Sequence, residues 1–569
     1  MNVALEDDLK FLVFLLVSCF CINTSFALEA DWSLTSVIPA SGHRKDIFNV
    51  GEEKLKTLTQ KGYLHALKYP VTVTGAFLPI EPFRYFMESN SKNPIRRLIQ
   101  SIARKKMPFS SMKQLYNWLG LAPYNNSSEV GIYKIPYPDG VRPEYPMGAS
   151  LVDTQWGKAL TFSCATCHAS SFFGKSIMGL TNKRVRANHF FVFAKQYIPY
   201  VTGGMFQFGT RANNQEKEMY VRTRSNLPSV GAIAPQVLGL DTSLPQIALS
   251  FARRADDDYA SKSKHFEKNP RKNRLETFVA DSKASVWWNL KYKTRWLSDG
   301  SIIKGNPVYT NFLWNEIGRG TDLKELEGWI NKSSKIVDEI TAALFATEAP
   351  IWTDFFSADR INISRAKNGE KYFNQTCRKC HGSYTKAWSL PESELLSPAE
   401  QIKTTRVRYF KRTPIKNVGT DPQRYQATQY FSDSLNKLSI SKSMGVIVKP
   451  QKGYVPPPLV GIFSRYPYMH NNSIPTLCDV LKNPAKRTKI FYQGPSVDKE
   501  TDYDFECVGY PTGNSIPSDW IKEEDALFDT SKPGLKNTGH FKNIMLTKDG
   551  VEKYTAQEKQ DIIEYLKTL

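Results

Sequence analysis

Hydrophobic positions near the C-terminal end of the chain are spaced as in two helices. Ala366, Gly369 and Phe373 follow one another at intervals of three and four residues, so they share one helix face. Residues 555–558 read Thr-Ala-Gln-Glu, a capping box that opens a second helix, and the apolar residues of 562–569 lie on one face of it. We expect the two helices to cross, because Gly369 has no side chain to hold the other one away.

The N-terminal half of the chain is patterned less regularly. Residues 94–103 read Pro-Ile-Arg-Arg-Leu-Ile-Gln-Ser-Ile-Ala and predict a helix with a basic face, which we expect to be a solvated surface helix rather than a membrane anchor. Residues 136–148 are rich in Pro and Gly and predict turns at a domain boundary. Residues 253–274 are dense in Lys, Arg and Asp and predict an exposed loop. Together these patterns predict a mainly α fold with long loops.

An apolar run stands close to the start of the chain. Residues 11–17 read Phe-Leu-Val-Phe-Leu-Leu-Val, which is too short for a membrane span of about 20 residues. With small residues at Ser25 and Ala27, the run predicts a cleaved signal peptide over residues 1–27. The alternative is a lipid-attachment motif at Cys19. In both cases we expect an exported protein, periplasmic or secreted, whose mature chain has no transmembrane segment.

Four of the eight cysteines lie in two Cys-x-x-Cys-His motifs. The two thiols of such a motif reach the two vinyl groups of one porphyrin, and the adjoining His lies under the iron as its proximal ligand. A zinc site would keep its two cysteine pairs closer in sequence, and a redox dithiol needs no following His. The chain is therefore expected to carry two covalently bound haem c groups. Their residues are Cys164, Cys167 and His168 for the first and Cys377, Cys380 and His381 for the second.

Beyond the expected signal peptide, the remaining cysteines are Cys478 and Cys507. Haem attachment of this type occurs outside the cytoplasm, where a disulfide is permitted. We expect these two thiols to be bonded, with two separate buried thiols as the alternative.

Basic residues outnumber acidic ones, with 76 Lys and Arg against 55 Asp and Glu and a formal net charge of +21. The excess is spread along the chain, and no nucleic-acid-binding motif accompanies it, so we expect no nucleic acid partner. A basic surface favours an acidic redox partner protein or an anionic membrane surface.

The two haem motifs predict two tandem c-type cytochrome domains preceded by an extra N-terminal region. After the signal peptide we expect a partly helical N-terminal extension over 28–148, a first haem domain over 149–345 and a second over 346–569. A helix with a small residue ahead of the motif, crossed by an amphipathic last helix, is the c-type cytochrome arrangement. The second domain shows this pattern, whereas the residues directly before Cys164 do not.

The sequence after the second motif resembles a known family. Residues 454–461 read Tyr-Val-Pro-Pro-Pro-Leu-Val-Gly and 466–477 read Tyr-Pro-Tyr-Met-His-Asn-Asn-Ser-Ile-Pro-Thr-Leu. With the Asn-Thr-Gly-His of 537–540 and the final residues 563–569, these are similar to the bacterial dihaem cytochrome c peroxidase superfamily, closest to its dihaem rubber-oxygenase-like (RoxA-like) branch. The resemblance covers about residues 150–569.

This resemblance implies different roles for the two haems. The N-terminal haem, with His168 below its iron, would be the reactive one, open to peroxide or dioxygen. The C-terminal haem would be six-coordinate and would transfer electrons. His540 is implied as its second iron ligand, and Met469 and His470 are the alternatives.

The far side of the first haem is left open by the sequence. His189, Met178 and Met205 are candidate neighbours there. The branch also keeps aromatic residues over its reactive haem, and Trp287 and Trp288 lie at the corresponding position, where they would exclude water and shape an apolar pocket.

Three functions fit these features. The first is a haem-dependent oxidoreductase that uses peroxide or dioxygen, with peroxide itself or an apolar molecule such as an alkene as substrate. The second is an electron-transfer cytochrome in which both irons are six-coordinate. The third is a sensor of oxygen or redox state. We expect the first, in which Trp287 and Trp288 join His168 at the site of reaction.

Overall fold

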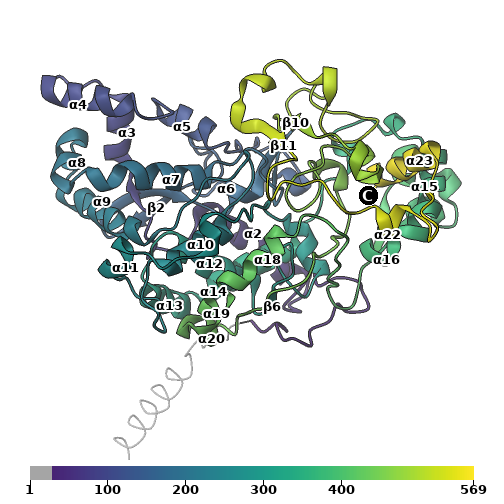
Figure 1. The fold of residues 1–569 in the computed structure, drawn as a ribbon, viewed down its shortest axis with the longest axis horizontal. Helices are drawn as coiled ribbons and strands as arrows, with labels where there is room; N and C mark the ends of the chain where they lie inside the picture. Colours follow the sequence, from purple (N-terminus) through teal and green to yellow (C-terminus); the bar gives the residue numbers. More distant parts are fainter. Residues whose placement is uncertain (1–27) are drawn as a thin grey trace, which may run out of the picture.

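The fold is described by a computed structural model over residues 28–569 (Figure 1). The expected signal peptide and Cys19 lie outside these residues. The described chain is mainly helical, as the sequence predicts, with short strands in one three-stranded and four two-stranded sheets. Within it no helix combines the length and the apolar character that a membrane span requires.

The N-terminal residues form helices that pack onto later parts of the chain. The helix expected over 94–103 is confirmed as α4, but its apolar side faces solvent. The elements are α2 (Glu52–Lys68), β1 (Leu78–Pro79), α3 (Ile80–Glu88), α4 (Pro94–Arg104) and α5 (Met112–Trp118). Strand β1 completes an antiparallel sheet of order β1-β3-β2, in which Leu78 and Leu151 both pair with Leu160.

The middle of the chain surrounds the first motif with hairpins and helices. Its first elements are β2 (Ala149–Thr154), β3 (Gly157–Phe162), α6 (Ala165–His168), β4 (Ala169–Phe172), β5 (Lys175–Met178), α7 (Ala187–Tyr197), α8 (Gly203–Thr210) and α9 (Asn214–Asn226). They are followed by α10 (Ser243–Ala252), α11 (Lys264–Lys268), the 3-10 helix η5 (Trp287–Tyr292), β6 (Ile302–Lys304), α12 (Pro307–Gly318), α13 (Leu323–Lys332) and α14 (Ser334–Ala346). The polar segment 253–274, expected to be an exposed loop, is a mixture of exposed and half-buried residues and contains α11. Arg254 within it is fully buried and donates to the carbonyls of Ile317 and Thr321.

The C-terminal part surrounds the second motif. Its helices are α15 (Ile363–Thr376), α16 (Arg378–His381), α17 (Pro398–Gln401), α18 (Gln423–Ala427), α19 (Ser432–Lys437), α20 (Ser439–Ser443), α21 (Leu477–Leu481), α22 (Lys542–Met545) and α23 (Ala556–Lys567). Its strands are β7 (Ser383–Lys386), β8 (Thr404–Arg408), β9 (Ile447–Val448), β10 (Ile490–Tyr492) and β11 (Leu527–Asp529). Helices α18–α20 return to pack on the α12–α14 region, where β9 pairs with β6 (Figure 1).

The predicted crossing of the first and last helices around the second motif is confirmed. Helix α23 opens with the Thr555–Glu558 capping box. It lies so close to α15 that a Cβ on Gly369 would stand 1.9 Å from the backbone oxygen of Asp561. Phe373 packs on Tyr565 with ring centres 5.2 Å apart.

A similar helix crossing lies beside the first motif. It is formed by two helices that are distant from each other in the sequence. Helix α2 packs on α14, and a Cβ on Gly62 would lie 1.9 Å from the oxygen of Glu339. The amide of Cys164 donates to the carbonyl of Ala66, four residues after Gly62. The helix that the sequence lacks directly before Cys164 is thus supplied by α2, and residues 69–163 are inserted between the helix and its motif.

Candidate functional site

The first motif holds its histidine in one orientation. Helix α6 follows β3, and the hairpin β4–β5 turns the chain back so that the amide of Gly179 donates to the carbonyl of His168 at 2.6 Å. The Nδ1 of His168 lies 2.9 Å from the carbonyl oxygen of Ser285. Because a carbonyl only accepts, Nδ1 carries the proton and Nε2 is left free as a ligand. Burial lowers the pKa of His168 to about 4, which keeps the imidazole neutral.

A large cavity opens beside this motif. It has about 1840 Å³ of space free of protein atoms, part of it open to solvent, and Cys164, Cys167 and His168 border it. The thiols of Cys164 and Cys167 are free and lie on the cavity wall, where they could bind a porphyrin.

The two tryptophans expected near this haem are separated by the fold. Trp287 borders the cavity and packs beside His168, with ring centres 5.5 Å apart. Trp288 is fully buried, does not border the cavity and donates its indole N–H to the carbonyl of Val460 at 3.0 Å. Consecutive residues in η5 point to different sides, so only Trp287 reaches the site.

None of the candidate neighbours His189, Met178 and Met205 borders the cavity. Met178 is buried in a small core with Trp287, and Met205 is exposed on α8. His189 stands near Asp525, and burial lowers its pKa. Among residues 28–569, His168 is the single His or Met side chain on the cavity wall.

The cavity wall instead carries polar groups that the sequence reasoning missed. Asn188 donates to the side-chain oxygen of Gln246 at 2.9 Å, and both border the cavity. Asp241 also borders it, accepts the amide of Ser243 at 2.5 Å, and has a pKa raised by burial. The stretch Asp-Thr-Ser before α10 indicates only a helix start, so no local signal marks Asp241 as a cavity residue.

Positive charge gathers between the two motifs. Lys283 and Lys293 border the cavity, and Arg465 lies near both of them and near His381. Burial, aided by Arg465, lowers the pKa of Lys293 to about 8 and that of Lys283 well below its usual value. Within the described residues none of the three has a carboxylate partner. Lys283 donates to the carbonyls of Arg465 and Pro467, and Arg465 donates to the carbonyl of Pro458.

Uncompensated buried cations are costly unless an anion joins them. The two porphyrin carboxylates of a haem would provide that anion. Arg424, which also borders the cavity, is already paired with Asp299 at 3.2 Å. The donor set around the cavity thus fits a haem.

The second motif orients its histidine in the same way as the first. The amide of Cys377 donates to the carbonyl of Phe373 at 2.8 Å, which continues α15 into the motif. Nδ1 of His381 donates to the carbonyl of Pro457 at 2.8 Å, so Nε2 is free. Tyr384 donates to the carbonyl of His381 and accepts the amide of Leu459, which ties the motif to the Pro-rich segment.

His540 faces His381. Their ring centres are 6.2 Å apart, and Nδ1 of His540 is buried without a hydrogen-bond partner in the described chain. Two imidazoles on opposite sides of one metal ion would have ring centres about 6.2 Å apart, from a metal–nitrogen bond of about 2.0 Å and about 1.1 Å from nitrogen to ring centre on each side. Burial lowers the pKa of His540 to about 3, so the ring is neutral as a ligand must be.

The backbone around His540 adopts a conformation that is rare for most residues. Gly539 and His540 have φ of 75° and 55°, both in the left-handed region. A Cβ on Gly539 would lie 2.3 Å from the backbone of Gly419, and the amide of His540 donates to the carbonyl of Val418. Strained backbone of this kind persists where the surrounding structure holds it and often marks functional sites.

The alternatives to His540 occupy other places. The ring of His470 stacks on Tyr454 with ring centres 3.9 Å apart. Met469 is partly buried and packs against the C-terminal core. The structure therefore brings His540, and not His470, opposite His381.

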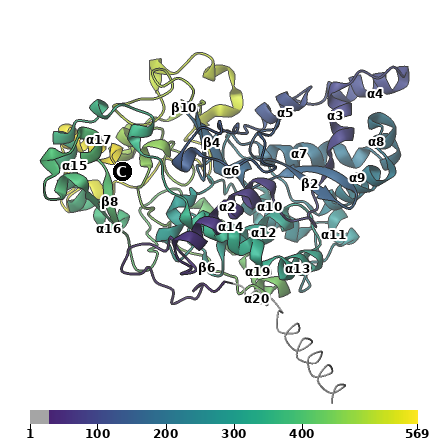
Figure 2. The same cartoon turned by 180° about the vertical axis from the view of Figure 1, so that it is seen from behind.

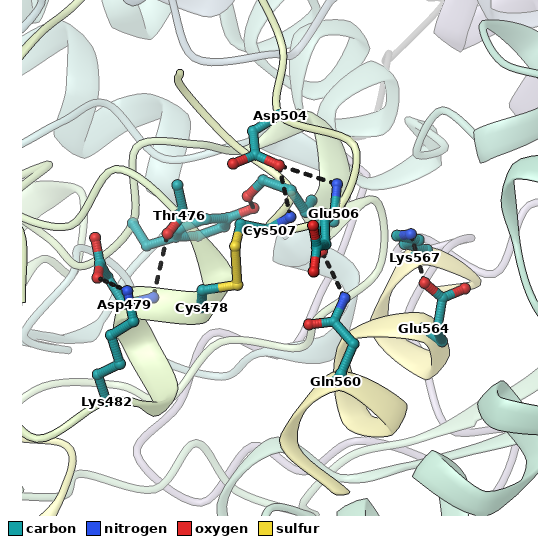
Figure 3. Close-up of a disulfide and its surroundings, with 12 residues drawn as sticks. Thr476, Cys478, Asp479, Lys482, Asp504, Glu506, Cys507, Gln560, Glu564 and Lys567 are labelled. Carbon is teal, nitrogen blue, oxygen red and sulfur yellow. Dashed lines mark hydrogen bonds and ion pairs between the residues drawn. A yellow bond between two sulfur atoms is a disulfide. The ribbon is translucent and has the colours of Figure 1, made fainter. Parts of the chain in front are cut away.

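Cys478 and Cys507 form the expected disulfide. It joins the first turn of α21 to the loop before residue 508, and Gln560 of α23 donates to the carbonyl of Glu506 in that loop (Figure 3). The bond thus secures the loop on which the last helix rests.

Parts of the chain, including this C-terminal region, are similar to known proteins. Two uncharacterized proteins of Sinorhizobium fredii (strain NBRC 101917 / NGR234) are similar to segments of the chain. The protein y4iM is 35% identical over 125 residues, which are 21% of this chain and 27% of the relative. The protein y4iJ is 35% identical over 113 residues, which are 20% of this chain and 17% of the relative. The chain thus covers about a quarter or less of the length of either relative.

A family model described as RoxA-like, cytochrome c-like matches residues 453–492. This segment holds the Pro457 carbonyl that orients His381, the Arg465 guanidinium and one half of the disulfide. Over these residues the protein is similar to the RoxA-like, cytochrome c-like family, which supports a cytochrome c with covalently bound haem.

Proposed function

We propose that the protein is an exported dihaem c-type cytochrome that acts as an oxidoreductase. In this proposal Cys164, Cys167 and His168 would hold a haem for the activation of peroxide or dioxygen, and the second motif with His540 would hold a haem for electron transfer. A difference between the two sites carries this proposal. His381 faces a second imidazole at ligand spacing, whereas His168 borders a cavity with no other His or Met on its wall in the described chain.

When bound, haem supplies iron-centred redox chemistry. The chain around the first site positions and shields it. The Ser285 carbonyl holds the His168 ring, and Trp287 packs beside that ring. Asp241 can hold a proton at the cavity wall, because its burial favours the neutral carboxyl. The proposed substrate is peroxide itself or an apolar molecule such as an alkene.

Hydrogen bonds and the backbone conformation hold the two histidines of the second site in place. His381 is fixed through Pro457 and Tyr384, and His540 through the left-handed turn at Gly539. His381 and His540 would hold the second haem with two neutral imidazoles, and that haem would supply electron transfer.

Other features support the wider proposal. The crossings at Gly62 and Gly369 support two cytochrome domains in tandem, with α2 as the first helix of the first one. The disulfide supports an oxidising compartment. The basic excess favours an acidic redox partner that brings or takes electrons.

Carbon monoxide binding to the reduced holoprotein tests the proposal, since the gas binds only an iron with an open site. We expect one molecule of gas per chain in the reduced protein, and one high-spin and one low-spin ferric signal in the electron paramagnetic resonance spectrum of the oxidised protein. If both irons are low-spin and no gas binds, the protein is an electron carrier and the enzyme proposal is wrong. Peroxide consumption and dioxygen uptake then separate the two possible oxidants.

Variants identify the ligands and the haem count. His540→Ala should make the second haem high-spin and raise carbon monoxide binding to two per chain, while the control His470→Ala should leave it at one. A low-spin second haem in His540→Ala would assign the ligand elsewhere. The double variant Cys377→Ala/Cys380→Ala should retain one covalent haem, and two haems in it would contradict the motif assignment.

A further inference from the structure

Helix α4 turns its apolar side toward solvent. It lies at the outer edge of the molecule, at the end opposite α15 and α23, in both views (Figures 1 and 2). Four large aliphatic side chains spaced as on one helix face are exposed: Ile95 at 62%, Leu98 at 61%, Ile99 at 42% and Ile102 at 56%. Of the helix residues only Gln100 is buried. This is the reverse of the usual orientation, in which the apolar stripe faces the core.

The polar side of α4 holds the helix on the protein. Gln100 donates to the carbonyl of Gly209 at 3.1 Å, and Nε of Arg96 donates to the carbonyl of Phe208 at 2.6 Å, both on α8. Nε of Arg104 donates to the carbonyl of Phe86 on α3 at 2.8 Å. Asn93 caps the helix by accepting the amide of Arg96. The helix is therefore already formed and oriented before anything covers its apolar face.

Exposed apolar side chains continue on the neighbouring helix. Helix α8, which packs on α4, exposes Met205 at 55% and Phe208 at 39%. Large apolar side chains exposed on two helices in contact indicate an interaction surface.

The surrounding charge indicates what covers the apolar face. Between Glu88 and Glu129 the sequence has no Asp or Glu. It has seven cations there: Lys92, Arg96, Arg97, Arg104, Lys105, Lys106 and Lys113. Apolar side chains on one side of a helix with clustered Lys and Arg beside them are typical of helices that lie in the surface of an anionic membrane.

We propose that α4 docks the protein on an anionic lipid surface. The row Ile95, Leu98, Ile99 and Ile102 enters the boundary between headgroups and acyl chains. Arg97, Lys105 and Lys106, whose side chains make no hydrogen bond or ion pair in the described chain, contact the lipid phosphates. The protein lies on the membrane through this helix and does not cross it.

Vesicle co-sedimentation of the purified holoprotein tests the proposal. We expect binding to vesicles of phosphatidylcholine mixed with phosphatidylglycerol, weak binding to phosphatidylcholine alone, and loss of binding as salt is raised. Leu98→Ser/Ile102→Ser should weaken binding by at least about tenfold, because two large side chains no longer transfer out of water. Arg97→Gln/Lys105→Gln should weaken binding to the anionic vesicles and leave binding to phosphatidylcholine unchanged.

Matched controls exclude a general effect of surface substitution. Leu395→Ser/Ile521→Ser replaces two aliphatic residues that are equally exposed elsewhere, at 84% and 52%, and should leave vesicle binding unchanged. Circular dichroism and haem content should be those of the unaltered protein in every variant, since all these side chains are exposed. The proposal is overturned if Leu98→Ser/Ile102→Ser binds vesicles as before, or if ultracentrifugation shows that the helix pairs with a second copy of the chain and vesicles do not compete.

Discussion

The crossing of α15 and α23 allows a prediction with a magnitude taken from the structure. In Gly369→Ala the new Cβ would lie 1.9 Å from the backbone oxygen of Asp561 and 2.4 Å from its carbonyl carbon. Ordinary van der Waals contact begins at 3.4 Å, so the two helices must part by about 1.5 Å along that line. The obstructing atoms are backbone and cannot rotate away. Overpacking of a core typically costs about 1–3 kcal/mol, and we expect the upper end here, about 3 kcal/mol.

For a cooperative unit of about 150–250 residues, that loss lowers Tm by about 6–12 °C. The parting of the helices would also separate Phe373 from Tyr565 next to the second motif. Differential scanning calorimetry of the holoprotein measures the change. Gly328→Ala is the matched control, because Gly328 is an exposed residue of α13 with no atom within 4 Å of a new Cβ. It should be neutral or stabilising by up to about 1 kcal/mol.

A Tm of Gly369→Ala within the error of the unaltered protein would show that α23 can move away freely. The reasoning from close approach would then be refuted. Gly62→Ala, with the same 1.9 Å approach to Glu339, extends the test to the crossing beside the first motif, where a similar loss is expected.

Three further predictions concern the disulfide, pH and the His540 turn. Cys478→Ser/Cys507→Ser opens a loop with a sequence separation of 29 and should cost about 3–4 kcal/mol; equal melting with and without the substitutions would contradict it. Burial raises the pKa of Asp281 to about 7, so the folded protein keeps a proton that the unfolded chain loses above about pH 4. The stability of the folded protein should therefore fall as pH rises from about 4 to about 7, by up to about 1.4 kcal/mol per pH unit. Asp281→Asn should flatten that slope in denaturant titrations at several pH values. Gly539→Ala, which meets backbone at 2.3 Å, should displace His540 and make the second haem partly high-spin; a fully low-spin spectrum would show that the turn does not hold the ring.

Features that depend on neighbouring residues could be predicted from the sequence alone. The Cys-x-x-Cys-His motifs, the helix through Ala366 and Phe373, and the capping box at Thr555 each depend on residues a few positions apart. Because Gly369 has no side chain, it predicted a close approach of two helices, and the structure shows that approach. Interactions within one or two helical turns are set by spacing alone, so they need no knowledge of the fold.

The direction in which a side chain points could not be predicted from the sequence. Trp287 and Trp288 are adjacent in sequence, yet only Trp287 borders the cavity. The basic face of residues 94–103 suggested a solvated helix, whereas its polar groups bind α3 and α8 and its aliphatic groups face outward. The periodicity of a helix identifies its apolar and its polar face. It does not determine which of the two faces packs against a neighbouring element.

By itself, the sequence determined a mainly helical chain with two haem-attachment motifs, the helices flanking the second of them, and the family resemblance of the segment that follows. Only the tertiary structure decided that α2 serves the first motif across the insertion 69–163, that Lys283, Lys293 and Arg465 gather without carboxylates, and that His540 faces His381. The reason is physical: each of these arrangements joins residues about a hundred or more positions apart. Such contacts depend on how whole elements pack rather than on the spacing of neighbours.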